Sequence, residues 1–181
     1  MNPIKSPLSA FDSVQISIVN ESVAMAEELV LDFYKMSSSQ WLHLRYDVKT
    51  LDGLHREEII DGPFAQVIRY EGRRENRLLS SSSYDFYKIC LQDHTILKTL
   101  TCHTDIGLYP FALYIVTHEL IHVVRFGKFL QLFNASGKEK EEEERRVHQH
   151  TREVLMSENI DGINAVFSFF RKWCDPLETL A

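Results

Sequence analysis

A nearly continuous run of apolar residues from Phe111 to Phe133 is the clearest pattern in the chain. A helix that is apolar on every side is one that other parts of the protein surround. Pro110 suits the first turn of such a helix, where the backbone N–H needs no partner. His118, Glu119 and other polar residues interrupt the run and would be costly in lipid. We therefore predict a long helix in the core of a domain, not a membrane span.

Helical spacing also predicts two helices before this run. Apolar residues recur at that spacing between Ala24 and Tyr34, with Asn20 as a plausible N-cap and Ser37 in the polar stretch that ends the pattern. Residues 14–19 fit either a short strand or the lead into this helix. Ser83 can cap the second helix, which would end near residue 100. Its apolar face would comprise Phe86, Ile89, Cys90, Leu97 and Leu100, with His94 on or beside it.

Two more helices are expected after the apolar run. Residues 134–137 break the pattern, and residues 139–156 follow with an acidic first turn that the helix dipole favours. A short terminal helix is predicted over residues 162–173. Together with the earlier elements, these make about five helices.

Strands are expected only in the first half of the chain. Residues 41–48 and 64–70 alternate imperfectly and carry β-branched and aromatic side chains. Asp52-Gly53 and Asp61-Gly62-Pro63 supply turn signals between them. We predict a helix-dominated α+β fold with a small antiparallel sheet, in a single domain over residues 1–181 whose residues 1–13 form a flexible or extended arm.

The overall composition limits the kinds of binding partner that we expect. The 181 residues carry a net charge of −6, which gives no general attraction for nucleic acid or an anionic membrane. Three cysteines without a C-x-x-C pair indicate neither a disulfide framework nor a zinc knuckle. The first residues contain no continuous apolar stretch of the kind that a secretory signal has. We expect a cytoplasmic protein that binds a peptide or small molecule.

The candidate chemistry lies in the segment His118-Glu119-Leu120-Ile121-His122. Residues four apart lie on one helix face, so His118 and His122 can bind a single ion. In hydrolytic sites, zinc held by neutral imidazoles lowers the pKa of a bound water to about 7, and a neighbouring carboxylate accepts its proton. This spacing predicts a metal site, most simply for zinc, with Glu119 as the general base.

The segment resembles the H-E-x-x-H helix of the zincin metallopeptidases, and the apolar residues on both sides of it fit the longer form of that signature. Arg125 stands where the metzincin branch has a glycine, and no third histidine follows at that branch's spacing. The resemblance is therefore closer to the gluzincins, in which a glutamate from a following helix is the third metal ligand. It implies a zinc-dependent peptidase or amidase in which activated water attacks a carbonyl.

Four consecutive residues, Glu141, Glu142, Glu143 and Glu144, could supply that third ligand. Helical phase directs Glu143 or Glu144 toward the core and leaves the other two more exposed, and we choose Glu144. His148, one turn later, could orient this carboxylate, donate to an oxyanion or bind the metal. The predicted metal ligands are His118, His122 and Glu144, and the predicted catalytic residues are Glu119 and His148.

Other assignments remain open. Glu119-x-x-His122 is also the element of carboxylate-bridged iron or manganese sites in helical bundles, for which Glu27, Glu28, Asp32 and Asp93 offer further carboxylates. His94 is an alternative third ligand. Weaker candidates are His103, Tyr109 and Tyr114 as substrate contacts, whereas His150 is expected to face solvent. A metal-stabilised binding protein is a further alternative to an enzyme.

Overall fold

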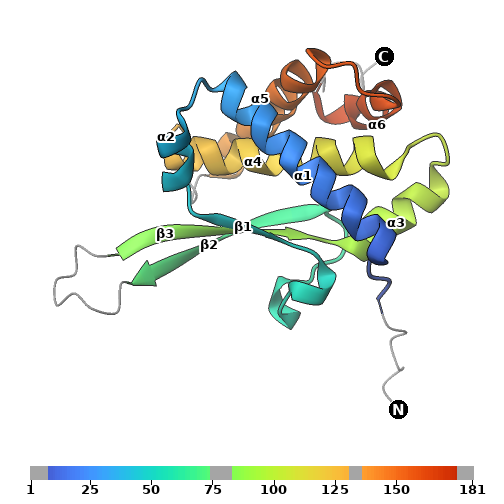
Figure 1. Ribbon diagram of the computed structural model, residues 1–181, viewed down its shortest axis with the longest axis horizontal. Coiled ribbons are helices and arrows are strands. Elements are labelled where there is room, and N and C mark those ends of the chain that lie inside the picture. The colour runs from blue at the N-terminus through green and yellow to red at the C-terminus, as the bar shows by residue number, and fades with distance from the viewer. Residues whose placement is uncertain (1–7, 74–82, 131–135, 175–181) are drawn as a thin grey trace.

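The computed structural model describes residues 8–73, 83–130 and 136–174, and it has an α+β fold dominated by helices. A three-stranded sheet lies on one side of α1, α4, α5 and α6, and the η1 and η2 turns lie on its other side (Figure 1). The elements are α1 Ser13–Phe33, α2 Ser38–His43, β1 Tyr46–Lys49, η1 Leu51–Gly53, η2 Arg56–Glu58, β2 Ala65–Arg73, β3 Ser83–Leu91, α3 Asp93–Cys102, α4 Leu108–Gly127, α5 Gly137–Met156 and α6 Ile163–Cys174.

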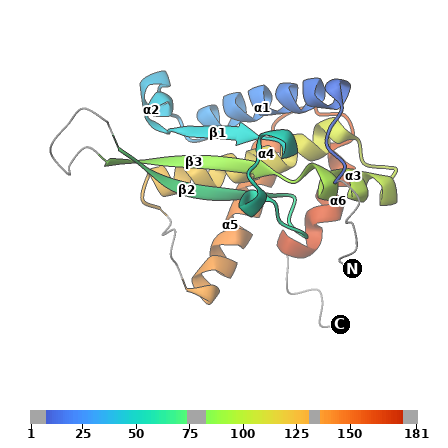
Figure 2. The same ribbon diagram turned by 90° about the horizontal axis from the view of Figure 1, so that it is seen from below.

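The sheet has the order β1-β3-β2, with β3 in the centre (Figure 2). β2 and β3 are antiparallel, but β1 and β3 are parallel, with Tyr46 opposite Tyr87. The prediction of an antiparallel sheet was therefore wrong for one of the two strand pairs. The reason is the connection through residues 50–64, which carries the chain from one edge of β3 to the other and so separates β1 from β2.

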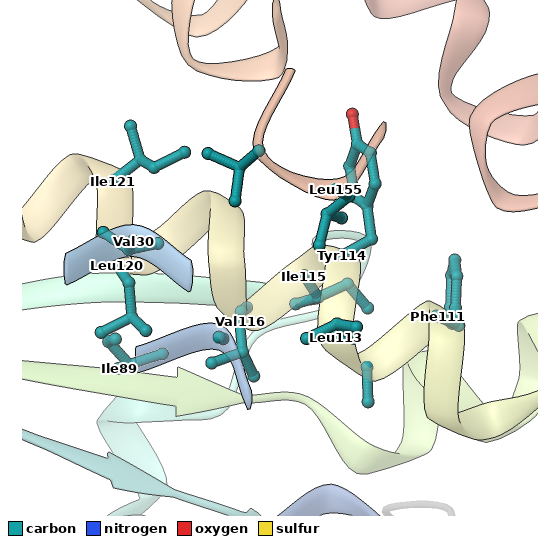
Figure 3. Packing of buried hydrophobic residues seen from close by; sticks show 14 of the residues in the cluster. Val30, Ile89, Phe111, Leu113, Tyr114, Ile115, Val116, Leu120, Ile121 and Leu155 are labelled. Carbon is teal, nitrogen blue, oxygen red and sulfur yellow. The ribbon is translucent and has the colours of Figure 1, made fainter. Parts of the chain in front are cut away.

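The long apolar helix is confirmed as α4, which lies at the centre of the molecule, but it ends at Gly127, before the predicted end at Phe133. Most of its side chains are buried between α1, the sheet and the helices α5 and α6. Figure 3 shows Val116 and Leu120 directed toward Ile89 of β3, while the hydroxyl of Tyr114 points the other way. None of the helices in the described part of the chain combines the length and apolarity needed to cross a membrane.

The first helix begins earlier than predicted. Asp12, not Asn20, is its N-cap, and Asp12 and Gln15 form a capping box in which each side chain accepts a hydrogen bond from the other's backbone N–H. Residues 14–19 are therefore helical. Of the predicted arm, residues 1–7 lie outside the described residues, and Phe11 is buried, with its N–H donating to Asp93.

A second capping box alters the predicted first strand. Ser37 and Gln40 cap the short helix α2, so residues 38–43 are helical. The strand β1 begins only at Tyr46, near the end of the predicted segment 41–48. Ser37 thus starts a helix directly after the preceding one ends, because its side-chain oxygen satisfies an N–H of the new first turn.

The predicted helix from Ser83 was wrong, because residues 83–91 form β3 and only residues 93–102 form α3. The apparent helical face joined residues of two different elements. Tyr84, Phe86, Tyr87 and Ile89 are aromatic or β-branched, which suits a central strand paired on both sides.

Buried polar side chains hold the connection between β1 and β2. The Glu58 carboxylate accepts hydrogen bonds from Lys88 Nζ at 2.6 and 2.8 Å and from Tyr70 Oη at 2.7 Å. The Gln92 side chain bonds to Glu58 O and to Ile60 N, each at 3.0 Å. The two Gln92 bonds satisfy backbone groups of the connection that have no partner in a helix or sheet.

Candidate metal centre

His118 and His122 of α4 bring their imidazoles together because they lie one turn apart on the same helix face. Their Nε2 atoms are 3.2 Å apart, and both residues are buried. His118 Nδ1 has no hydrogen-bond partner among the described residues. The second nitrogen of a ligating histidine normally has such a partner, so His118 departs from the usual pattern, and its Nε2 is the atom that faces His122 and Glu144.

α5 brings the carboxylate of Glu144 to the same point. Glu144 Oε2 lies 3.2 Å from His118 Nε2, and Oε1 lies 3.1 Å from His122 Nε2. Tetrahedral zinc with bonds of about 2.0–2.1 Å holds neighbouring donor atoms roughly 3.3 Å apart. The three donor groups are therefore spaced as ligands of one such ion would be, without any movement of the helices.

Two opposing effects act on the ionisation of Glu144. Burial alone would raise the pKa of its carboxyl, but hydrogen bonds with His118 and His122 outweigh burial and lower the pKa below its usual range. The group is therefore a carboxylate at neutral pH, the form in which it binds cations. Its side chain remains 54% exposed, so the centre opens to solvent on this side.

His148 lies one turn beyond Glu144 on α5. Its ring centroid is 4.3 Å from that of His118, and ligand atoms of His118, Glu144 and His148 all lie within 4.8 Å of one another. Its Nδ1 is 2.8 Å from the hydroxyl of buried Tyr114. Burial, followed by repulsion from His118, lowers the pKa of His148 to about 3, so its imidazole is neutral at neutral pH.

Glu119 lines the same pocket as His118, His122 and Glu144. Burial raises the pKa of its carboxyl above the ordinary value, whereas His118 and His122 act in the opposite direction. Its position next to His118 places a second carboxyl group beside the candidate ligands, distinct from Glu144.

The pocket has a volume of about 630 Å³. α4, α5, α6 and β2 with the turn that precedes it all contribute to its walls. The lining residues are Gly62, Pro63, Phe64, Ala65, Gln66, Val67, Tyr114, Ile115, His118, Glu119, His122, Phe126, Lys140, Glu144, His148 and Phe170. Aromatic and aliphatic side chains thus surround a small group of acids and imidazoles, as in many ligand sites.

The β2 wall is an open sheet edge. Gln92 N donates to Phe64 O, which sets the alternation of the antiparallel pairing with β3. In this alternation Ala65 and Val67 turn their backbone N–H and C=O groups away from β3. Both residues line the pocket, so β2 presents backbone hydrogen-bonding groups beside the candidate metal ligands.

The remaining glutamates of the run do not reach the histidines in the same way. Glu141 and Glu142 are exposed, as the helical phase predicted. Glu143 is buried, but it forms ion pairs with Arg125 and Arg146. Only Glu144 is within 3.2 Å of both His118 and His122 in the described residues.

The other sequence candidates lie elsewhere. His94 Nε2 is 3.1 Å from Ile60 O, so His94 supports the connection before β2. His103 packs on Phe169, and His150 is half-buried against Tyr34 instead of facing solvent freely. Tyr109 is half-buried, with its carbonyl accepting from Ser22.

The carboxylates considered for an iron or manganese bundle also have other surroundings. Glu27 accepts a hydrogen bond from Tyr46, Asp93 accepts from two backbone N–H groups, and Asp32 pairs with Lys35 on the surface. Glu28 is exposed. Within the described ranges, none of these belongs to the group of potential metal ligands around His118.

Sequence reasoning missed Arg125 and β2 as parts of this region and left Tyr114 without a definite role. A signal was present for two of them, because Tyr114, His118, His122 and Arg125 follow at intervals of four, four and three residues and so share one face of α4. Nothing in the local sequence indicates that β2 faces the pocket. No protein-family model, curated protein or solved structure matches this chain.

Proposed function

We propose that this protein is a metal-dependent hydrolase, with zinc as the most suitable ion, that acts on peptide or related amide bonds. The observation that carries the proposal is the set of three donor groups, from His118, His122 and Glu144, spaced 3.1–3.2 Å apart on the wall of a pocket. Two imidazoles and one carboxylate form the ligand set of zinc sites that leave a coordination position open for substrate.

A zinc ion bound there would supply a Lewis acid that activates water and polarises a carbonyl group. Glu119 lies beside the ligands without being needed as one, so it accepts the proton from the attacking water and passes it to the leaving amine. His148, neutral and held by Tyr114, offers its ring to the oxygen on which negative charge develops.

The shape of the pocket supports an extended substrate. β2 offers the outward N–H and C=O groups of Ala65 and Val67, and a peptide backbone can pair with such an edge as an added strand. The apolar side chains of Ile115, Phe126 and Phe170 line the pocket, so that substrate side chains can pack against them.

A second candidate is a metal site without hydrolytic activity. The proximity of His148 favours it, because this imidazole could act as a fourth ligand and complete the coordination of the ion. Iron or manganese in place of zinc is compatible with the same donor set, although the imidazoles suit zinc well.

Metal analysis combined with peptide cleavage tests the proposal. We expect about one zinc per chain in the wild type, loss of the metal in His118→Ala and Glu144→Ala, and retention in Glu119→Gln with loss of cleavage of a quenched fluorescent peptide library. Retained metal without cleavage by the wild type would favour the second candidate. A wild-type protein that takes up no zinc, iron or manganese would contradict both.

A further inference from the structure

A buried ion pair lies one turn beyond the candidate ligands. The Arg125 side chain of α4 donates from Nε to the carboxylate of Glu143 on α5, and Arg146 donates to the other oxygen of Glu143 at 2.8 Å. Arg125 and Glu143 are each only 6% exposed. Arg125 also interacts with Tyr34, the C-cap residue of α1, so the pair connects α4 and α5 with the end of α1.

The first half of α5 contributes no buried apolar side chain of its own. Residues 137–146 are all polar or glycine, and Glu143 is the only one of them that is buried. Apolar packing of this helix begins at Val147. That apolar face sets the overall phase of the helix and places Glu143 and Glu144 on its inner side, but no apolar contact in the first half chooses between these two.

The side of α5 that faces α4 determines which glutamate of the run reaches the histidines. Successive residues of an α-helix are rotated by about 100°, so a shift of one position would direct a different glutamate toward the histidines. The phase of α5 leaves Glu141 and Glu142 exposed. Glu143 and Glu144 are chemically identical, and the histidines alone cannot distinguish between these two. Arg125 can, because it lies three residues after His122 and binds the glutamate that immediately precedes Glu144.

We infer that the Arg125–Glu143 ion pair fixes the rotation of the first half of α5, so that Glu144 and not Glu143 reaches the metal ligands of α4. Arg125 and Glu143 are positioning residues in this account, which rests on the proposed metal site. A buried ion pair is often no more stabilising than an apolar pair of the same size. Its value here is that it tolerates fewer alternative arrangements of the two helices.

The decisive variant replaces the pair without leaving a buried charge. In Arg125→Met/Glu143→Met, we expect thermal unfolding close to that of the wild type, because both charges are removed together. The zinc dissociation constant should rise at least tenfold, and the visible spectrum of the Co²⁺-substituted protein should change. The matched control is the exposed pair Asp32–Lys35, for which Asp32→Asn/Lys35→Gln should leave both metal measurements unchanged.

Charge reversal supplies the rescue. Arg125→Glu and Glu143→Arg should each weaken zinc binding more than the double methionine variant does, and Arg125→Glu/Glu143→Arg together should recover most of the loss. Glu143→Gln, which keeps the shape of the side chain, serves if a reversed variant does not fold, and its zinc binding should also weaken.

The outcomes separate this inference from the proposed function. If the wild type binds zinc through Glu144 while the double methionine variant keeps the same affinity and Co²⁺ spectrum, the ion pair is only structural and the inference is overturned. If the wild type binds no metal at all, the proposed function fails first, and the inference fails with it.

Discussion

The hydroxyl of Tyr114 lies 2.8 Å from Nδ1 of His148, and both side chains are buried. The direction of this hydrogen bond determines what His148 offers to the pocket. When Tyr114 donates, the neutral ring carries its proton on Nε2 and can stabilise an oxyanion. When Nδ1 donates to Tyr114, Nε2 has a lone pair and can bind a metal.

Replacing Tyr114 by phenylalanine tests this relationship. Tyr114→Phe removes the hydrogen bond and keeps the ring that stacks on Phe170, so we expect a loss of about 1 kcal/mol in the free energy of unfolding. If His148 donates a hydrogen bond to the oxyanion, kcat for a cleaved peptide should fall about tenfold while zinc content stays constant. A loss of zinc in this variant would instead identify His148 as a ligand.

Metal binding should stabilise the fold. A ligand at 100 times its dissociation constant stabilises the native state by about 2.7 kcal/mol, which for a protein of this size corresponds to a rise of roughly 5–11 °C in Tm. We expect this rise when zinc is added to chelator-treated wild type, measured by calorimetry. Glu144→Ala should show little of it, whereas Glu142→Ala, a change in an exposed neighbour, should behave as the wild type.

Acid should weaken the structure through Glu58. Burial opposes ionisation of this carboxyl, but hydrogen bonds from Lys88 and Tyr70 prevail and lower its pKa from 4.5 to about 2. Because the folded pKa is the lower one, the stabilisation is complete above about pH 4.5 and is lost as the pH falls toward 2. Urea unfolding at several pH values should show this loss in the wild type.

Two variants isolate the contribution of Glu58. Glu58→Gln should unfold with a free energy about 3 kcal/mol lower at pH 7, because it leaves Lys88 buried without its counter-charge, and its stability should fall less between pH 4.5 and 2. Glu57→Gln, at the exposed neighbouring position, should keep the wild-type profile. An equal acid response in all three proteins would rule out this assignment.

The open edge of β2 gives a test of substrate pairing. Val67→Pro removes an N–H that points away from β3, so the β2–β3 ladder keeps its hydrogen bonds and the fold should survive. We expect KM for an extended peptide to rise several-fold, since one backbone hydrogen bond is lost. Val67→Ala is the control for the side chain, and an unchanged KM in the proline variant would mean that substrate does not pair with this edge.

The sequence predicted the central helix and the phase of the helix after it because both carry strong local patterns. α4 is apolar on all sides, and Val147, Thr151 and Leu155 define the buried face of α5. From that phase alone, Glu144 could be chosen over Glu141 and Glu142. Helical phase did not separate Glu144 from Glu143, and the ion pair that occupies Glu143 involves Arg125 of a different helix.

The errors came from elements that other parts of the chain stabilise. The local sequence of β3 is compatible with either a strand or a helix, and its pairing with both β1 and β2 makes it a strand. The Asp12–Gln15 and Ser37–Gln40 capping boxes were local signals that could have been recognised. The β2 wall of the pocket was unpredictable, because bonds from Gln92 and Lys88, about thirty residues later, fix the segment before it.

The candidate ligands belong to helices of very different local stability. His118 and His122 lie in a helix buried almost throughout, whose amides should exchange with solvent only when the whole molecule unfolds. Glu144 lies in a half-helix of exposed, charged residues held chiefly through Glu143. Local opening of α5 would therefore release the carboxylate while the imidazoles stay in place, which gives a bound ion a route of escape, and an incoming one a route of capture, without global unfolding.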